Sequence, residues 1–581
     1  TGGVHVTAKD LTQRQKFQAT VNSKGMVEGG AMVSRNGIIS IVAAGNAKVS
    51  GKVRVDANPS GQGGDINIIS GGDITLAPTA KLSADGKGKS GIGGTIVVYA
   101  GSSLFAQTGA VISSHGAGTG AGGFVELSGK NAEIGGVILD LVSDSGAGGT
   151  LLIDPIDVTI TARNSIISGG VNVSILADNS IIIEAGGSID TTLSSGTSGD
   201  ITLTAPILSV AAGGVLNAAA LGGGTAGTVN LIATKTDGGT AQIIVGGEIR
   251  GGDVNLLATS TAAPLSIIAS LPTAHAEVSI NGGQINASGV LTATATASTA
   301  ASSVNLPIGV VVTNVSASVD VTGGAVLDSM SANLSSIATV DTQISTKSLV
   351  PANSQADGAV AVSTVTSVAS THVGDADLTV SGNVSLGATN TVTSHADATP
   401  ISAALGASVA VSVVSATTTA KVDGMGYINA ASLSLDATTT TDIVAKAAAA
   451  AGGATEPQAG SQADTYLNDP DYKSAASTSE GQVSVVGALA ISDLISTTTA
   501  RMDSGRASDI SGSASINTLT SNTADVTADG SAVDSTVGVG VAVGINKAKV
   551  HNDATLGGQG ISTGSLVVTA AMTVGGSNMG I

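Results

Sequence analysis

The stretch Gly63-Gly64-Asp65-Ile66-Asn67-Ile68-Ile69 begins with a glycine pair and continues as an alternating apolar run, and this signal keeps returning along the chain. The glycine that precedes each strand-like run stands at positions 64, 94, 123, 149, 199, 227 and 252. The differences between successive positions are 30, 29, 26, 50, 28 and 25, and we interpret the 50 as two of the others. A fixed period of this kind is typical of stacked repeat proteins. Period-two alternation indicates strands, so we expect an all-β solenoid whose glycines supply positive φ at tight corners.

The composition favours a long repeat protein over a conventional globular one. The chain has 581 residues, of which 42% are hydrophobic but only 1% aromatic, with no Trp. A core must therefore be built from Val, Ile, Leu and Ala, which suits thin layers of small, similar side chains. In a solenoid each repeat contacts only its neighbours, so the core can grow lengthwise without forming several separate domains.

Charge and cysteine content narrow the class of protein further. The net charge is −19, so we expect no nucleic-acid binding, because phosphate backbones would be repelled. No apolar run reaches the roughly 18 residues that a membrane span needs. There is no Cys, and a secreted surface protein with a continuous hydrogen-bonded core can do without disulfides. The sequence begins at Thr1 without a signal peptide, and we interpret it as an internal piece of a longer protein.

The repeat pattern divides the chain into two segments. Residues 1–300 carry the glycine-marked units, and residues 301–581 carry longer units rich in Val, Ala, Ser and Thr, with a period of about 50 residues. Alignment on the residues that close each apolar run gives two aliphatic columns, which are Leu306, Val360, Val409, Leu489 and Val537, and Ile308, Val362, Val411, Ile491 and Val539. The two columns are two residues apart, so they share one face of a strand.

We expect this shared face to point into the core. Val411 would then be buried, while the adjacent Ser412 would face solvent. We interpret a unit near 50 residues as two coils of about 25, which predicts a right-handed parallel β-helix of about 20 coils and on the order of 100 Å in length.

One unit of the second segment contains an insertion, near residues 447–480. It contains two of the four tyrosines of the chain and several acidic residues. Loops that protrude from rigid repeats often carry recognition. We therefore predict a partner-contact loop at Tyr466, Asp469, Asp471 and Tyr472.

Two motifs in the first segment carry a family resemblance. Residues 122–130 read Gly-Gly-Phe-Val-Glu-Leu-Ser-Gly-Lys, and residues 149–160 read Gly-Thr-Leu-Leu-Ile-Asp-Pro-Ile-Asp-Val-Thr-Ile. This pair resembles the shaft of two-partner-secreted exoproteins, the filamentous-haemagglutinin-like adhesins, closely over 120–160 and in style over 30–260. Members of that family often carry Thr where Leu127 stands and Trp where Leu151 stands. The second segment is similar to the repeats of large bacterial surface adhesins only in its general composition and repetitiveness.

The resemblance implies a secreted right-handed β-helix that holds a bacterial cell to a surface, another cell or a biofilm matrix, and it supplies no catalytic residues. It implies a cell-surface receptor or extracellular polysaccharide as partner, and an outer-membrane transporter as partner during secretion. The alternative is a polysaccharide-active β-helix enzyme, a lyase or hydrolase. Three carboxylates that converge on one groove would favour the enzyme, and a surface of Thr, Ser and Asn would favour the shaft.

The residues themselves point to no catalytic, cofactor or metal site. Asp65, Asp73, Asp200 and Asp253 are dispersed at strand starts, where they are expected to cap turns. Six histidines (His5, His115, His275, His372, His395 and His551) have no metal-ligand spacing, so we expect them on the surface. The nonapeptide that builds calcium rolls is absent, and Asn468-Asp469-Pro470-Asp471 could supply only part of a calcium site. We therefore expect no cofactor.

Overall fold

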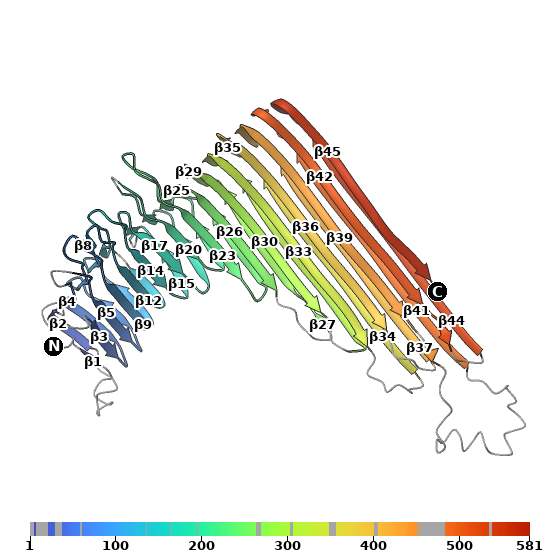
Figure 1. The fold of residues 1–581 in the computed structure, drawn as a ribbon, viewed down its shortest axis with the longest axis horizontal. Coiled ribbons are helices and arrows are strands. Elements are labelled where there is room, and N and C mark those ends of the chain that lie inside the picture. Colours follow the sequence, from blue (N-terminus) through green and yellow to red (C-terminus); the bar gives the residue numbers. More distant parts are fainter. Residues whose placement is uncertain are drawn as a thin grey trace, which may run out of the picture.

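The computed structural model describes residues 5–6, 21–28, 38–57, 61–134, 136–163, 165–193, 196–262, 269–302, 306–347, 356–399, 405–449, 451–452, 483–533 and 537–580. Within these ranges all regular structure is β-strand, and none is helix. The strands stack side by side from the N-terminal to the C-terminal end and lengthen toward the C-terminus (Figure 1). The prediction of an all-β parallel solenoid is confirmed.

Sheet 1 runs the length of the stack as one parallel ladder of sixteen strands within the described residues. In order these are β1 (His5–Val6), β3 (Ile38–Ala43), β5 (Asp65–Ser70), β9 (Thr95–Ala106), β12 (Phe124–Ile134), β14 (Thr150–Asp154), β17 (Asn172–Leu176), β20 (Ile201–Thr204), β23 (Val229–Lys235), β26 (Val254–Ala262), β30 (Val290–Ser302), β33 (Ser331–Lys347), β36 (Asn383–Thr399), β39 (Ser432–Ala448), β42 (Ser508–Asp529) and β45 (Ile561–Gly580).

Sheet 2 forms a second parallel ladder, which shares β9 and β12 with sheet 1. Its other strands are β2 (Val21–Glu28), β4 (Ala47–Arg54), β6 (Ile74–Leu76), β15 (Asp157–Ile160), β18 (Ser180–Ile183), β21 (Ile207–Val210), β24 (Gly239–Val245), β27 (Ala269–Ser270), β28 (Thr273–Asn281), β31 (Ile308–Thr322), β34 (Ala356–Val373), β37 (Leu405–Val422), β41 (Val483–Met502) and β44 (Val537–Leu556).

Sheet 3 consists of short strands and closes one side of the coils. Its first part contains β7 (Lys81–Ser83), β10 (Val111–Ser113) and β13 (Ile138–Asp140). Its second part contains β16 (Ile166–Ile167), β19 (Ser188–Asp190), β22 (Val215–Asn217), β25 (Glu248–Gly251), β29 (Gln284–Ala287), β32 (Ala325–Ser329), β35 (Ala376–Val380) and β38 (Tyr427–Ala430). Two small pairs stand apart, antiparallel β8 (Ser90–Gly91) with β11 (Ala117–Gly118) and parallel β40 (Ala451–Gly452) with β43 (Ala532–Val533).

The glycine period of the first segment corresponds to one coil per period. The register joins six side chains into a continuous column in which no member is more than 1% exposed, namely Ile66, Ile96, Val125, Leu151, Val173 and Ile201. The interval of 50 residues between Gly149 and Gly199 spans two coils, because β17 lies between β14 and β20 in the ladder and belongs to a coil that no glycine of the series marks. The interpretation of that interval as two periods is confirmed.

The glycines that precede these strands are required by close approach of the coils, and not by a positive φ. A Cβ added at Gly94 would collide with the carbonyl oxygen of Gly64, and one added at Gly123 would collide with that of Gly94. Neither Gly94 nor Gly123 has a positive φ. Each glycine therefore lets the backbone of one coil rest directly on the previous coil.

The second segment corrects the prediction that each long unit is divided into two coils. Val360 on β34 pairs with Val409 on β37, and Leu489 on β41 pairs with Val543 on β44, so equivalent positions of successive units are direct neighbours in the ladder. Each unit is thus one enlarged coil, because its two long strands have 15–22 residues each. Sixteen strands in sheet 1, spaced by about 4.8 Å, give a stack of about 70 Å, shorter than the expected length.

The second segment also reverses the predicted faces. Ser412 is 0% exposed and Ala410 is 0% exposed, whereas the side chain of Val411 is only half-buried and points outward. Sheets 1 and 2 lie so close that the hydroxyl oxygens of Ser412 and Ser394 on the facing strand are 2.7 Å apart. Only small side chains fit between the sheets at this depth, so Val409, Val411 and Val413 of β37 are placed outside, whereas Val414 and Val422 further along the strand are buried.

The predicted columns were correct in their middle members and wrong at their ends. The register joins Val360, Val409 and Leu489, and it joins Val362, Val411 and Ile491, as predicted. Ile308, however, pairs with Val360, and Val539 pairs with Val485. These shifts are even numbers of residues, so the end members still face the same side of the sheet.

Candidate functional surfaces

The predicted partner-contact loop lies outside the described residues. Tyr466, Asp469, Asp471 and Tyr472 all fall within residues 453–482. At one boundary of this range Ala449 is buried and its N–H donates to the carbonyl oxygen of Asp529 at 2.8 Å, and at the other boundary β41 begins at Val483. The segment therefore follows β40 and leads into the start of a sheet 2 strand.

The dispersed aspartates of the first segment bind the backbone of the next coil. The Oδ1 atoms of Asp73, Asp200 and Asp253 accept hydrogen bonds from the N–H groups of Ser103, Thr228 and Val290, at 3.1, 2.7 and 2.8 Å. Each carboxylate belongs to a different coil. These contacts agree with a capping role, with Asp73 directly before a strand of sheet 2 and Asp200 and Asp253 directly before strands of sheet 1.

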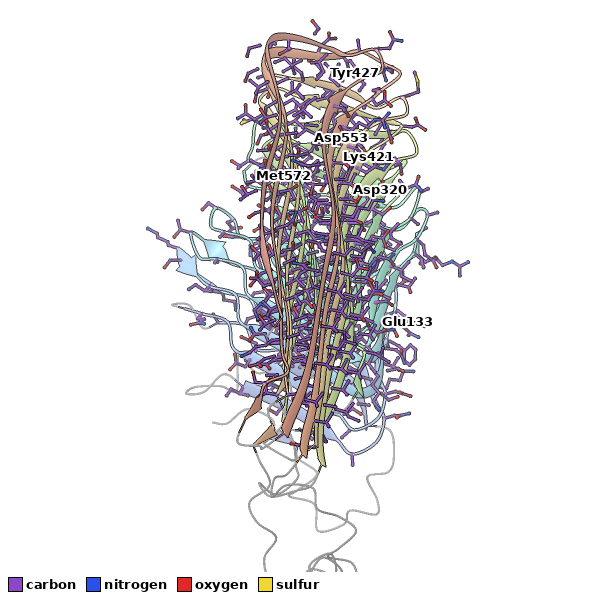
Figure 2. All side chains as sticks on the ribbon, turned by 90° about the vertical axis from the view of Figure 1, so that its right-hand side faces the viewer. Glu133, Asp320, Lys421, Tyr427, Asp553 and Met572 are labelled. Carbon is purple, nitrogen blue, oxygen red and sulfur yellow. The ribbon has the colours of Figure 1, made fainter. Side chains whose placement is uncertain are left out.

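Histidines lie beside carboxylates of neighbouring coils. The ring nitrogens Nδ1 and Nε2 of His372 lie 2.6 Å from Asp320 Oδ1 and 2.7 Å from Asp423 Oδ1. Burial alone would lower the pKa of His372, but the hydrogen bonds to Asp320 and Asp423 outweigh it and raise the pKa. Burial would raise the pKa of Asp423, but hydrogen bonds from His372 and Lys421 lower it. Asp320 and Lys421 lie on the same side of the stack (Figure 2).

The same arrangement recurs in the first segment and on sheet 1. His115 lies 3.0 Å from Asp140 and 3.1 Å from Asp144, and these hydrogen bonds raise its pKa against the opposing effect of burial. His395 Nε2 lies 3.0 Å from Asp442 Oδ2. These pairings, which sequence reasoning missed, connect coils. Within the described residues no group of three or more His, Asp or Glu side chains is placed to hold a metal ion.

A first groove, of about 770 Å³, follows the short strands of sheet 3 across several coils. Its lining is mostly Ala, Ser, Asn, Thr and backbone glycine, and it includes a single carboxylate, Asp328, and a single cation, Arg250. This lining is composed largely of small and polar side chains, like the surface of Thr, Ser and Asn that is expected for a shaft.

A second groove, of about 1050 Å³, lies on sheet 2 near the N-terminal end and contains more charged and aromatic side chains than the first. Phe105, Glu133, Asp157 and Arg163 line it. Asp157 pairs in register with Asn131, so Glu133 is offset from it by one strand and two residues, which places their Cα atoms about 8 Å apart. Glu133 projects from the side of the stack that also carries Asp320 and Lys421 (Figure 2). Sequence reasoning missed this pair, because the two carboxylates are 24 positions apart in the chain.

Comparison with known proteins adds no family to this description. No family profile, no curated protein and no solved structure matches the chain. Among the described residues, no helix is long and apolar enough to cross a membrane.

Proposed function

We propose that this chain is a structural shaft of a secreted bacterial surface adhesin, which mediates attachment between cells, to surfaces or within a biofilm matrix. The observation that carries the proposal is the unbroken parallel ladder of sheet 1 from β1 to β45. Adjacent coils of the second segment are joined by 18 register pairs between β37 and β41 and by 16 between β39 and β42. A load along the stack is shared by these backbone hydrogen bonds in parallel, so the coils resist separation together.

The outer surface and the family resemblance support the same function. The outward positions of sheet 1 in the second segment are mostly hydroxyl and amide side chains, such as Thr389, Thr391 and Asn333. The two motifs that resemble haemagglutinin-like shafts lie on adjacent strands, with Phe124 paired to Thr150. The proposal includes secretion through an outer-membrane transporter and binding of a cell-surface receptor or an extracellular polysaccharide by the whole adhesin.

Removal of whole coils tests the proposal. Residues 356–404 form one repeat, since Ala356 pairs with Leu405. Their deletion should preserve the β fold and shorten the stack by about 4.8 Å. Cells that display the chain fused to an adhesive tip should lose adhesion gradually as one, two or three coils are removed. Complete loss of adhesion on removal of any one coil, with folding intact, would contradict a shaft.

One observation keeps the enzyme as a second candidate. Glycoside hydrolases use two carboxylates separated by about 5–9.5 Å, a range that the facing side chains of Glu133 and Asp157 can reach. Phe105 in the same groove offers an apolar surface for a sugar ring. Incubation with bacterial and host polysaccharides, followed by a reducing-end assay, decides between the two functions. Depolymerisation that is lost in both Glu133→Gln and Asp157→Asn would establish the enzyme, and unchanged polysaccharide supports the shaft.

A further inference from the structure

The outer face of sheet 2 contains a block of ten aliphatic side chains. They occupy two adjacent register rows across five consecutive strands, β31, β34, β37, β41 and β44. This aliphatic face consists of Ile308, Val360, Val409, Leu489 and Val543 in one row, and Val310, Val362, Val411, Ile491 and Ile545 in the next. The members at its edges are the most exposed, with Ile308 at 49% and Ile545 at 47%. All ten are at least partly open to solvent.

Strand propensity alone does not account for this face. β-branched side chains favour strands, but Thr satisfies that preference as well as Val does. Further along β37 the outward positions change from Val409, Val411 and Val413 to Ser415, Thr417 and Thr419. On sheet 1 the outward positions of β36 are largely Thr and Ser. Exposed aliphatic side chains also occur on sheet 1, such as Leu519 and Val567, but the two continuous rows across five strands lie at this one end of the long strands of sheet 2.

The core does not require these residues either. On β34, β37 and β41 the inward neighbours are small, and Ser363, Ser412 and Ser492 are all 0% exposed. The chain thus places serines inside and larger aliphatic residues outside. An exposed apolar patch rimmed by polar residues is typical of an interaction surface.

We propose that the aliphatic face binds the same face of a second copy of this chain, as a two-fold symmetric contact between shafts. The inference goes beyond the proposed function and relies on it only for its biological use. A two-fold contact requires a self-complementary surface, and a regular row of branched aliphatic ridges meets this condition when two sheets pack face to face at about 10 Å.

Charge favours a second copy over other partners. Two chains of net charge −19 repel each other, so their contact must be free of charge, as the ten positions are. In the adjacent row, Asp493 and Lys547 already pair with each other at 3.0 Å, so the rim of the face is neutralised within one chain. A basic partner would instead bind the carboxylates around His372, and an anionic lipid surface would be repelled by the acidic chain.

The size of the face predicts weak association. Five strands cover about 24 Å, and the two rows extend about 13 Å along them, which gives about 300 Å² per copy. The total is about 600 Å², below the roughly 1,000 Å² of a stable specific interface, so one pair of faces makes only a weak contact. A single pair of shafts would therefore separate readily, whereas many parallel shafts on one cell or on two facing cells would be held by the sum of their contacts.

Sedimentation velocity of the full 581-residue chain, from micromolar to millimolar concentration, tests this inference. The natural chain should form a dimer whose fraction rises with concentration and with added salt, because salt screens the repulsion between acidic chains. The double variant Val411→Glu with Ile491→Glu should weaken dimerisation at least about tenfold, since four carboxylates, two from each copy, would be buried at the contact. Val411→Thr with Ile491→Thr, which keeps the branching at Cβ and the strand preference and adds no charge, should weaken it less.

The matched control is Thr391→Glu with Thr440→Glu. These two threonines are also register partners on adjacent strands, but they face outward from sheet 1. The control carries the same added charge and should dimerise like the natural chain. Three results would overturn the inference: a monomeric natural chain throughout, equal weakening in the variant and the control, or a monomeric natural chain that sediments with phosphatidylcholine vesicles through the aliphatic face. Failure of the coil-removal adhesion experiment with dimerisation intact would remove only the proposed function.

Discussion

His372 Nδ1 lies 2.6 Å from Asp320 Oδ1, although the two residues are 52 positions apart, because they are register partners on adjacent strands β31 and β34. The other ring nitrogen contacts Asp423, which follows β37 in the next coil, at 2.7 Å. One imidazole therefore connects three consecutive coils on the outer face of sheet 2. The contact couples the cohesion of the stack to the protonation of a single side chain.

Coil cohesion around His372 should depend on pH. Its pKa is raised above 6.5, so the contribution of His372 to stability is fully present below pH 6.5 and is lost as the pH rises through the folded-state pKa. The pKa of Asp423 is lowered below 3.8, so its contribution is present above pH 3.8 and is lost as the pH falls through the lowered value. Hydrogen-exchange protection of residues 318–323, 370–373 and 420–426 should therefore be greatest between these limits.

His372→Gln provides the control for this pH dependence. It retains a polar side chain of similar length but cannot take a proton in this range. Its protection factors, corrected for intrinsic exchange, should be lower than those of the natural chain below pH 6.5 and nearly constant from pH 5 to pH 9, a range chosen around the ordinary histidine pKa of about 6.5. An unchanged pH dependence in this variant would show that another group is responsible.

Buried hydroxyl groups form a continuous chain between the two long sheets. Thr439 Oγ1 lies 2.6 Å from Thr418 Oγ1 and 2.6 Å from Thr498 Oγ1, and Thr520 donates to Thr498 at 2.8 Å. Thr439→Val keeps the volume but removes a partner from two buried hydroxyls, which should cost about 1–3 kcal/mol. Thr440→Val changes an exposed, outward residue of the same strand and should cost less than about 0.5 kcal/mol. Equal loss of hydrogen-exchange protection in β39 would contradict the network.

Excision of residues 453–482 should preserve the stack. The pairing of β37 with β41 spans Leu405–Val485 to Val422–Met502 without a register shift, so the coils on either side of this segment are continuous. A variant with a short Gly-Ser bridge between Gly452 and Val483 should keep its β-type circular dichroism and its cooperative unfolding. Excision of β37, residues 405–422, is the control and should open the neighbouring coils. A bridged variant that unfolds like this control would assign the segment to the core.

The first segment was predictable because backbone packing determines its glycine positions. The coils touch at the residue before each strand, where a Cβ does not fit, so the glycines mark the start of β9, β12 and β14. Nothing comparable marks the coils of the second segment. Its long period was recognised, but its division into two coils was wrong, because strands of 15–22 residues are far longer than the usual length.

The face of the long strands could not be predicted from alternation. A period of two shows that Val411 and Ser412 point in opposite directions, but it does not show which direction is inside. Hydrophobicity favours burial of Val411, whereas the narrow space between the sheets favours Ser412. The second effect decides, and it depends on a distance between sheets that the sequence does not express. The contact of His372 with Asp320 was missed because it requires each long unit to form a single coil.

Aspartate substitutions at two adjacent positions should separate these alternatives. Ser412 is 0% exposed, and its hydroxyl lies 2.7 Å from Ser394 Oγ and donates to the Ser394 carbonyl oxygen at 3.1 Å, so Ser412→Asp would bury a carboxyl group in a space sized for a hydroxyl. The expected cost is about 3–5 kcal/mol. Val411→Asp adds a charge on the outer face and should cost about 1 kcal/mol, mostly through lost strand propensity.

Local opening requires a local measurement, because a solenoid can lose one coil while its other coils remain folded. Hydrogen exchange of residues 405–422 and of the facing residues 383–399 should therefore increase strongly in Ser412→Asp and little in Val411→Asp. The double variant Ser394→Ala with Ser412→Ala removes both hydroxyls together and should cost less than Ser412→Asp, since no charged group is buried. Greater loss of protection in Val411→Asp than in Ser412→Asp would place Val411 inside and overturn both the narrow interior and the aliphatic face.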